Sequence, residues 1–148
     1  MLSAAYIYGE VARRGIPRGY PDSDGYLSAY VTIAEGSFNI RIHKLIFFIE
    51  NGYLPEHVDH KDGNILNNEP SNLRAATKSQ NHHNSKKPKN NTSGVKGVSW
   101  NKNAGKWEVK VCLNRKSYSG GLHLNLEDAR IAAESLRKKL HGDFARNI

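Results

Sequence analysis

The stretch that decides the fold is Val58-Asp59-His60-Lys61-Asp62-Gly63-Asn64. Twelve residues after His60 comes Asn72, in Asn72-Leu73-Arg74, and nine residues further on comes Asn81. A carboxylate beside an imidazole, followed by two side-chain amides at fixed spacings, supplies the groups needed to hold one divalent cation against a phosphodiester. The pattern over residues 56–84 predicts strand, loop, strand and helix.

Each of these side chains has a chemistry that suits such a site. Asp59 and the amide oxygen of Asn81 are hard oxygen ligands of the kind that Mg²⁺ prefers. A neutral His60 is able to take a proton from water, because the ordinary pKa of histidine lies near neutral pH. Asp59 and His60 point to opposite sides of an extended strand, so we expect the chain to turn out of the strand at His60. Asn72 is expected to fasten the loop by bonding backbone groups across it.

The composition limits the class of protein. In 148 residues, Lys and Arg outnumber Asp and Glu by 22 to 14, a formal charge of +8 that favours binding to polyanions such as nucleic acid. The single cysteine, Cys112, excludes a disulfide framework or a cysteine zinc cage within one chain. No apolar run approaches the ~20 residues that span a bilayer, and the N-terminus lacks the pattern of a signal peptide. An intracellular protein with no membrane partner is expected.

The first half of the chain predicts three kinds of element. Residues 1–25 show no clean periodicity and are expected to form loop with one short strand. Residues 25–42 predict a β-hairpin that turns at Glu35-Gly36-Ser37. Residues 44–51 predict a short apolar helix that ends at Gly52, before Pro55. Thr77 and Gln80 have the spacing of a capping box, so a helix carrying Asn81 is expected to start there.

The second half predicts a separate domain after a basic linker at residues 85–91. Short strands are expected over residues 95–100, 106–113 and 117–122. A helix with Asn125 as its N-cap is then expected to end near His141. The sequence therefore predicts an α+β protein: a first domain over residues 1–84 and a domain of three antiparallel strands packed on one helix over residues 92–148.

The motif Asp59-His60-Lys61-Asp62-Gly63-Asn64, with Asn72-Leu73-Arg74 and Asn81, resembles the HNH endonucleases, in the branch common among phage homing endonucleases. The resemblance covers residues 38–84. It implies a ββα-metal core over about residues 56–84, with one divalent ion, Mg²⁺ or its substitute Mn²⁺, bound by Asp59 and Asn81. It also implies two catalytic residues: His60 as the general base, and Asn72 as the middle residue of the motif, which fastens the loop. The implied products of DNA cleavage are 5′-phosphate and 3′-hydroxyl ends.

Several histidines leave alternatives open. His82 and His83 stand beside Asn81 and are alternative ligands, although adjacent helical residues point about 100° apart and cannot all face one ion. Exposed helix surface is the preferred interpretation for both. His43, at a helix start, is expected either to pack in the interior or to contact a DNA phosphate.

The C-terminal domain has its own basic cluster. From Ser85 to Tyr118 there are nine basic residues and one acidic residue, Glu108, with Trp100 and Trp107 among them. A sheet with interleaved lysines and aromatic residues is predicted to enter the DNA major groove, while the alternative is a solvated face with tryptophans packed under the helix.

The segments Lys96-Gly97-Val98-Ser99-Trp100, Gly105-Lys106-Trp107 and Leu140–Ala145 resemble the APETALA (ethylene-response-factor) DNA-binding domain over residues 92–146. The resemblance implies DNA contacts by seven residues: Lys96, Ser99, Asn101, Lys106, Lys110, Lys116 and Tyr118. The plant domains use arginine at several of these positions, so base reading is expected to be weak and phosphate anchoring retained.

Together these features predict a two-domain, metal-dependent endonuclease of the homing type that nicks or cuts double-stranded DNA. In a phage, the protein would act in the cytoplasm of the bacterial host. The rivals are a non-catalytic DNA-binding regulator with a decayed nuclease core and a packaging factor that coats nucleic acid. The sequence leaves open the target site and a monomeric or homodimeric state.

Overall fold

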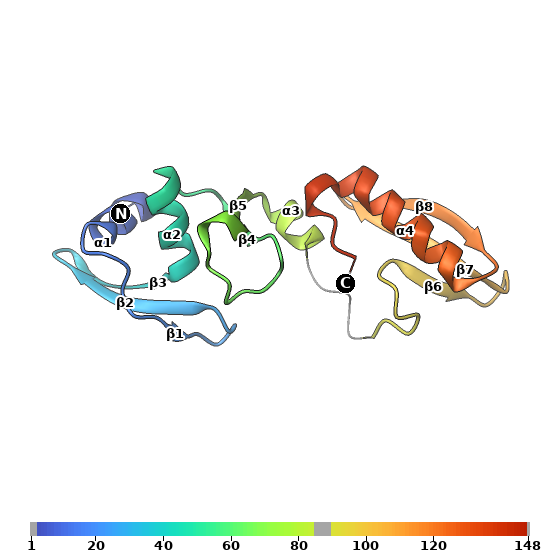
Figure 1. Ribbon diagram of the computed structural model, residues 1–148, viewed down its shortest axis with the longest axis horizontal. Helices are drawn as coiled ribbons and strands as arrows, with labels where there is room; N and C mark the ends of the chain where they lie inside the picture. Colours follow the sequence, from blue (N-terminus) through green and yellow to red (C-terminus); the bar gives the residue numbers. More distant parts are fainter. Residues whose placement is uncertain (1–2, 85–89, 148) are drawn as a thin grey trace. The chain divides into compact units, whose positions relative to one another are not determined.

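A computed structural model describes residues 3–84 and 90–147, and the chain divides into two compact units, Met1–Lys78 and Ser79–Ile148 (Figure 1). The predicted linker, residues 85–91, falls mostly on residues 85–89, which lie outside the described part of the chain. In the described residues, no helix has the length and apolar character needed to cross a bilayer.

The first unit contains a three-stranded antiparallel sheet of β1 (Tyr20–Pro21), β2 (Leu27–Ile33) and β3 (Gly36–Arg41), in that order. The predicted hairpin corresponds to β2 and β3, with Ala29 opposite Ile40 on the inner face and Tyr30 opposite Asn39 on the outer face. This alternation follows from the period of two along a strand.

Of the prediction for residues 1–25, the one short strand is confirmed as β1, but the assignment of the remainder as loop was wrong, because α1 (Ala4–Ala12) precedes β1. Ser3 caps this helix by accepting a hydrogen bond of 3.2 Å from the backbone N–H of Tyr6. Only Tyr8 and Val11 are buried among its residues. A helix with so few core residues leaves little periodic signal in the sequence.

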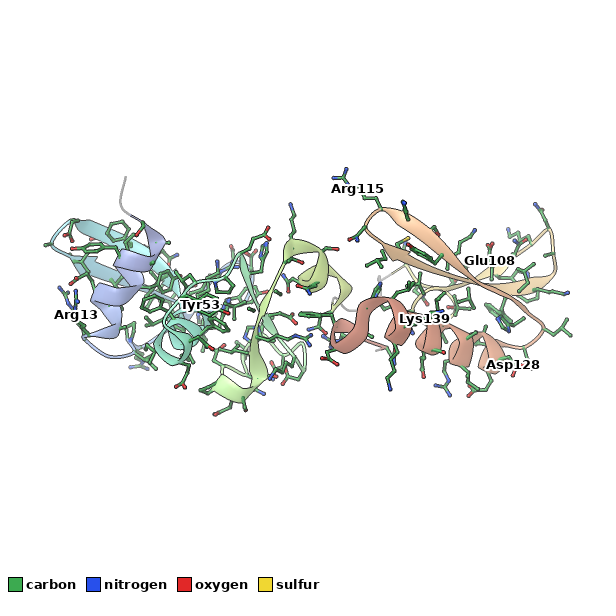
Figure 2. The ribbon with its side chains drawn as sticks, turned by 90° about the horizontal axis from the view of Figure 1, so that it is seen from above. Arg13, Tyr53, Glu108, Arg115, Asp128 and Lys139 are labelled. Carbon is green, nitrogen blue, oxygen red and sulfur yellow. The ribbon has the colours of Figure 1, made fainter. Side chains whose placement is uncertain are left out.

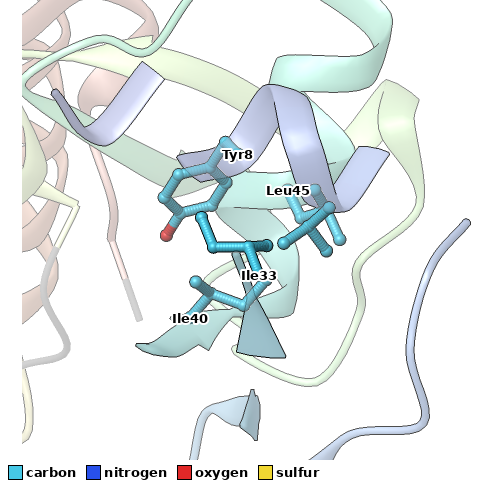
Figure 3. Packing of buried hydrophobic residues seen from close by; sticks show 5 residues of the cluster. Tyr8, Ile33, Ile40 and Leu45 are labelled. Atoms are coloured by element: carbon cyan, nitrogen blue, oxygen red, sulfur yellow. The ribbon is translucent and has the colours of Figure 1, made fainter. Parts of the chain in front are cut away.

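The next helix, α2 (Ile42–Asn51), joins two hydrophobic clusters. Leu45 packs with Tyr8, Ile33 and Ile40 against α1 and the sheet (Figure 3), whereas Phe47 packs with residues of the following hairpin. The helix begins two residues earlier than predicted, so Ile42 is helical, and it ends at Gly52, which has a left-handed φ of 74°.

The predicted strand, loop, strand and helix follow in that order. Strand β4 (His57–His60) pairs antiparallel with β5 (Leu73–Ala76), and a 3₁₀ turn, η1 (Pro70–Asn72), precedes β5. Val58 and Leu73 pack with Phe47 of α2, which places this hairpin on the helix. Helix α3 (Lys78–His83) starts directly after Thr77, where the capping box predicts it.

The second unit contains a three-stranded antiparallel sheet with one helix along one face (Figures 1 and 2). The strands are β6 (Val98–Asn101), β7 (Lys106–Leu113) and β8 (Lys116–His123), and the helix is α4 (Leu126–His141). Asn125 caps α4 by accepting a bond of 2.8 Å from the N–H of Asp128. Val98 and Val109 pack against Ala129 and Ala133 in the core. The predicted mixed α and β architecture of this domain is confirmed.

Candidate functional site

The β4–β5 hairpin positions Asp59 and His60 at the end of a buried strand. Asp59 faces Arg74 across the pair and His60 faces Leu73, and both Asp59 and His60 are 4% exposed. The chain turns directly after His60, whose carbonyl accepts a bond of 2.8 Å from the N–H of Gly63. The turn that was expected directly after His60 is therefore present in the fold.

The carboxylate of Asp59 is held by Arg74. The Nε and Nη2 atoms of Arg74 lie 2.8 Å and 2.7 Å from Oδ2 of Asp59. A charged group that is removed from water needs an opposite charge and hydrogen bonds. Arg74 meets this need and fixes the orientation of the carboxylate at the end of β4.

The ring of His60 lies in a small cluster of rings. Its Nε2 atom is 3.0 Å from Oδ1 of Asn68, in the loop between the strands. The centroid of the His43 ring lies 5.0 Å away and that of Tyr26 lies 6.1 Å away. The guanidinium of Arg41 stacks on the Tyr26 ring, 4.3 Å from its centroid.

Asn72 bonds both sides of the loop between β4 and β5. Its Oδ1 accepts from the N–H of Asp62 at 3.1 Å, and its Nδ2 donates to Oδ1 of Asp62 at 3.0 Å and to the carbonyl of Asn67 at 2.8 Å. Its carbonyl also accepts from the N–H of Lys61 at 2.9 Å. Bonds from the Asn67 side chain and the Asn64 N–H lower the pKa of Asp62. These contacts correspond to the loop-fastening role that was expected of Asn72.

The position of His43 bears on the alternatives that the sequence left open. This residue is 3% exposed, and burial together with the neighbouring His60 lowers its pKa to about 3. Within the described residues, its Nδ1 atom is buried with no hydrogen-bond partner. A neutral, buried ring is unsuited to binding a phosphate, so the structure favours packing and argues against the predicted DNA contact.

The second predicted metal ligand, Asn81, lies on α3 and is half-buried. It belongs to the second unit, whereas Asp59 belongs to the first, and the proposed pairing of these two ligands stays a prediction. The side chains of His82 and His83, the alternative ligands, lie outside the described part of the structure.

Metal sites built only from His, Cys, Asp and Glu need several such side chains close together. Among the side chains that the structure describes, which exclude those of His82 and His83, no three of these residue types gather in that way. The predicted ligand pair contains one carboxylate and one amide, and such a site takes further oxygen ligands from water and phosphate. The donor chemistry of Asp59 and Asn81 thus fits a hard divalent cation and does not fit a zinc cage.

In the second unit, four of the predicted DNA contacts share one face of the sheet. Asn101 pairs with Lys106, and Ser99 pairs with Glu108. Lys110 follows on the same face, because side chains alternate along a strand. This open face, defined by Ser99, Asn101, Lys106, Glu108 and Lys110, is opposite the face that carries Val98 and Val109 against α4. On this face, the carboxylate of Glu108 forms an ion pair of 2.8 Å with the ammonium group of Lys110.

By register, the aromatic residues do not lie among the lysines of the open face, which favours the alternative with the tryptophans packed under the helix. Trp100 pairs with Trp107, next to the buried pair of Val98 and Val109, so by register both tryptophans belong to the face that bears α4. Trp107 packs against the core there, and the two rings meet edge to face at 5.0 Å. Tyr118 pairs with the buried Val111 and therefore belongs to the same face.

Two further residues that were predicted to contact DNA, Lys116 and Lys96, do not belong to the open face. Lys116 pairs with Leu113 and lies two residues before Tyr118 on β8, so by register it shares the face of Tyr118 and not the open face. Lys96 lies before β6 and is half-buried, and its carbonyl accepts a bond from the buried Arg137. Burial and the charges of Arg137 and Arg146 lower the pKa of Lys96 to about 8.

Sequence reasoning gave no role to Arg74 or Asn68. Arg74 ends the Asn72-Leu73-Arg74 segment of the motif, and the antiparallel pairing of β4 with β5 places it opposite Asp59. Asn68 had no such signal, because it contacts His60 from within an irregular loop.

Comparison with known proteins finds a family match in the segment that carries Asp59 and His60. Residues 41–83, which include α2, β4, β5 and α3, match the HNH endonuclease family. Over 108 residues the chain is 39% identical to Protein 3.8 of Escherichia phage T7, covering 72% of this chain and 88% of that protein. No solved structure matches the chain. The chain therefore belongs to the family of phage T7 Protein 3.8 and contains an HNH endonuclease domain.

Proposed function

We propose that this protein is a metal-dependent HNH endonuclease that hydrolyses phosphodiester bonds of double-stranded DNA to 5′-phosphate and 3′-hydroxyl ends. The observation that carries the proposal is the pair of adjacent, buried residues Asp59 and His60 at the end of β4, within the segment that matches the HNH family. A buried carboxylate beside a buried imidazole is costly to fold and suits a reaction that needs both.

Asp59 and Asn81 would hold the divalent ion, which is Mg²⁺ in this proposal, with Mn²⁺ as a substitute. When bound, the ion supplies positive charge that stabilises the developing charge on the phosphate and the leaving oxygen. Arg74 orients the carboxylate of Asp59 from the neighbouring strand, at 2.7 Å and 2.8 Å. Oxygen ligands of this kind suit Mg²⁺ better than softer metals.

His60 acts as the general base that removes a proton from the attacking water. His43 and Tyr26 pack near its ring, with centroids 5.0 Å and 6.1 Å away, and limit the orientations that the imidazole is able to adopt. Asn72 fixes the backbone on both sides of the loop that follows His60. Positioning of this kind contributes strongly to hydrolysis of a stable bond.

The second unit would bind DNA through its open face. Lys106 and Lys110 would contact phosphates, and Ser99 and Asn101 would add hydrogen bonds. Lys96, Lys116 and Tyr118 remain contacts suggested by the APETALA resemblance alone. A weak binding surface joined to a nuclease raises the local concentration of DNA at the catalytic residues, which is the arrangement expected of a homing-type enzyme.

A plasmid-nicking assay tests this proposal. Wild-type protein is expected to convert supercoiled plasmid to nicked or linear DNA with Mg²⁺ and to leave it intact with EDTA. His60→Ala is expected to abolish cutting while binding to a DNA duplex is retained. If the protein binds the duplex but cuts the plasmid with no divalent ion that is tested, the result would favour the alternative, a DNA-binding regulator whose nuclease core has decayed.

A further inference from the structure

Asn68 contacts the proposed general base from the loop between β4 and β5. Its Oδ1 atom lies 3.0 Å from Nε2 of His60. An amide oxygen has lone pairs and no hydrogen, so the ring nitrogen facing it must carry the hydrogen of this bond. In a neutral imidazole, the lone pair then belongs to the other nitrogen, Nδ1.

We propose that Asn68 is a positioning residue that keeps His60 in the tautomer with hydrogen on Nε2 and the proton-accepting lone pair on Nδ1. This inference rests on the proposed role of His60 as the general base. Asn68 does not belong to the residues predicted from the sequence motif, which are Asp59, His60, Asn72 and Asn81.

Exchange of the two ring nitrogens is restricted by the surroundings of His60. The residue is 4% exposed, and the planes of the His43 and His60 rings are tilted by 57° at a centroid distance of 5.0 Å. Tyr26 contributes a further ring at 6.1 Å. A flip of the imidazole would require these neighbours to move, because buried side chains have little free space around them.

Asn68 is itself held in place by its loop. Its N–H donates to the carbonyl of Leu66 at 3.1 Å. The preceding residue, Asn67, donates from Nδ2 to Asp62 at 2.8 Å and accepts from Nδ2 of Asn72 at 2.8 Å. Asn72 therefore supports the base indirectly, through the residue next to Asn68.

The tautomer matters because a ring nitrogen that carries hydrogen is unable to accept a proton from water. If His60 adopted the other tautomer, its Nδ1 atom would be a donor. Loss of the hydrogen-bond partner that orients a metal-ligating histidine typically lowers activity by about 10- to 100-fold, and we take the same range for a partner of the base. We expect Asn68→Leu to lower kcat by about this factor and to change KM for plasmid by less than about twofold, because the DNA-binding surfaces are retained.

Nuclear magnetic resonance tests the tautomer without any catalysis. Long-range ¹H–¹⁵N correlations of the full chain, at a pH where His60 is neutral, are expected to show hydrogen on Nε2. Asn68→Asp retains an oxygen acceptor and should keep that tautomer, whereas Asn68→Leu should show a mixture of the two. The matched control is Asn64→Ala, which removes a 3.2 Å bond to the Leu66 N–H in the same loop and leaves Asn68 intact.

The outcomes separate this inference from the proposed function. Hydrogen on Nδ1 of His60 in the wild type would overturn the inference, and so would Asn68→Leu with the kcat of the wild type. Should Asn68→Leu fail to fold, the wild-type spectrum still tests the tautomer. The kcat values of two other variants then test the role of Asn68: Asn68→Asp, which keeps an acceptor, is expected to have a greater kcat than Asn68→Ala, which has none. Cutting by His60→Ala would instead refute the general-base role and leave the tautomer measurement unchanged.

Discussion

Arg74 donates a hydrogen bond of 2.8 Å from Nε to Oδ2 of Asp59, and its Nη2 atom forms an ion pair with the same oxygen at 2.7 Å. The side chains are 15% and 5% exposed, and they meet across the β4–β5 pair. The arginine thus compensates a carboxylate that the hairpin has removed from water. The same contact orients the residue that we propose as a metal ligand.

Removing this arginine should destabilise the first unit strongly. Arg74→Leu is expected to lower the free energy of unfolding by about 3–5 kcal/mol, because it leaves the Asp59 charge buried without its cation. Urea titrations should follow amide signals of β4 and β5, since both tryptophans lie in the second unit and do not report on the first.

Two controls distinguish the buried pair from ordinary ion pairs. The double variant Asp59→Asn with Arg74→Leu should recover part of the loss, because no uncompensated charge remains. Arg13→Ala removes a surface pair with Glu10 in which the arginine side chain is 71% exposed, and its effect should stay below about 1 kcal/mol. Equal losses in Arg74→Leu and Arg13→Ala would contradict the buried-pair interpretation.

His43 should make the first unit sensitive to acid. Burial lowers its pKa from an ordinary value of 6.5 to about 3. Between these two values the unfolded chain binds a proton that the folded chain does not, so stability is complete above pH 6.5 and falls as the pH drops toward 3. Each unit of pKa difference corresponds to about 1.4 kcal/mol.

The variant His43→Phe should lose much of this acid sensitivity while keeping a ring in the same place. Urea midpoints of the first unit, measured from pH 7 down to pH 4, give the comparison. His57→Gln serves as the control, because the His57 side chain is 36% exposed and lies beside Glu56 at the start of β4. A wild type and a His43→Phe variant with the same pH profile would rule out the buried neutral ring as the cause.

Asn72 should control the opening of the loop between β4 and β5. Its side chain makes three hydrogen bonds, at 3.1, 3.0 and 2.8 Å, to Asp62 and Asn67. Asn72→Ala is expected to lower the local opening free energy of residues 61–69 by about 1–3 kcal/mol, since partners are left unsatisfied. Native-state hydrogen exchange measures this, with Ser71→Ala, an exposed neighbour, as the control. Unchanged protection at the Asp62 amide would contradict the prediction.

The parts of this fold that the sequence predicted are those with strong local signals. Gly52 with Pro55 marks the end of α2, and Asn125 marks the start of α4, because caps and breakers act over a few residues. Helix α1 lacked such a signal, since it buries only Tyr8 and Val11.

The candidate site shows the same division between local and long-range information. Asp59 and His60 were found by their adjacency, and Asn72 by its spacing. The contacts of His60 with Asn68 and His43 join separate elements, and no periodic pattern predicts them. In the second unit, alternation along β7 puts Lys106 and Glu108 on the face opposite Trp107. The cross-strand register that adds Ser99 and Asn101 to the same face came from the structure.

DNA binding by the second unit should depend on the open face and not on its basic helix. Lys106→Ala and Lys110→Ala are each expected to weaken binding to any duplex and to reduce the slope of log K against log salt by about one, because each would remove one phosphate contact. Lys139, on α4 (Figure 2), is exposed and offers a matched control of the same charge. Fluorescence anisotropy with a labelled duplex at several salt concentrations supplies the slopes. A larger effect of Lys139→Ala than of the two sheet lysines would place DNA on the helix side and refute the open-face assignment.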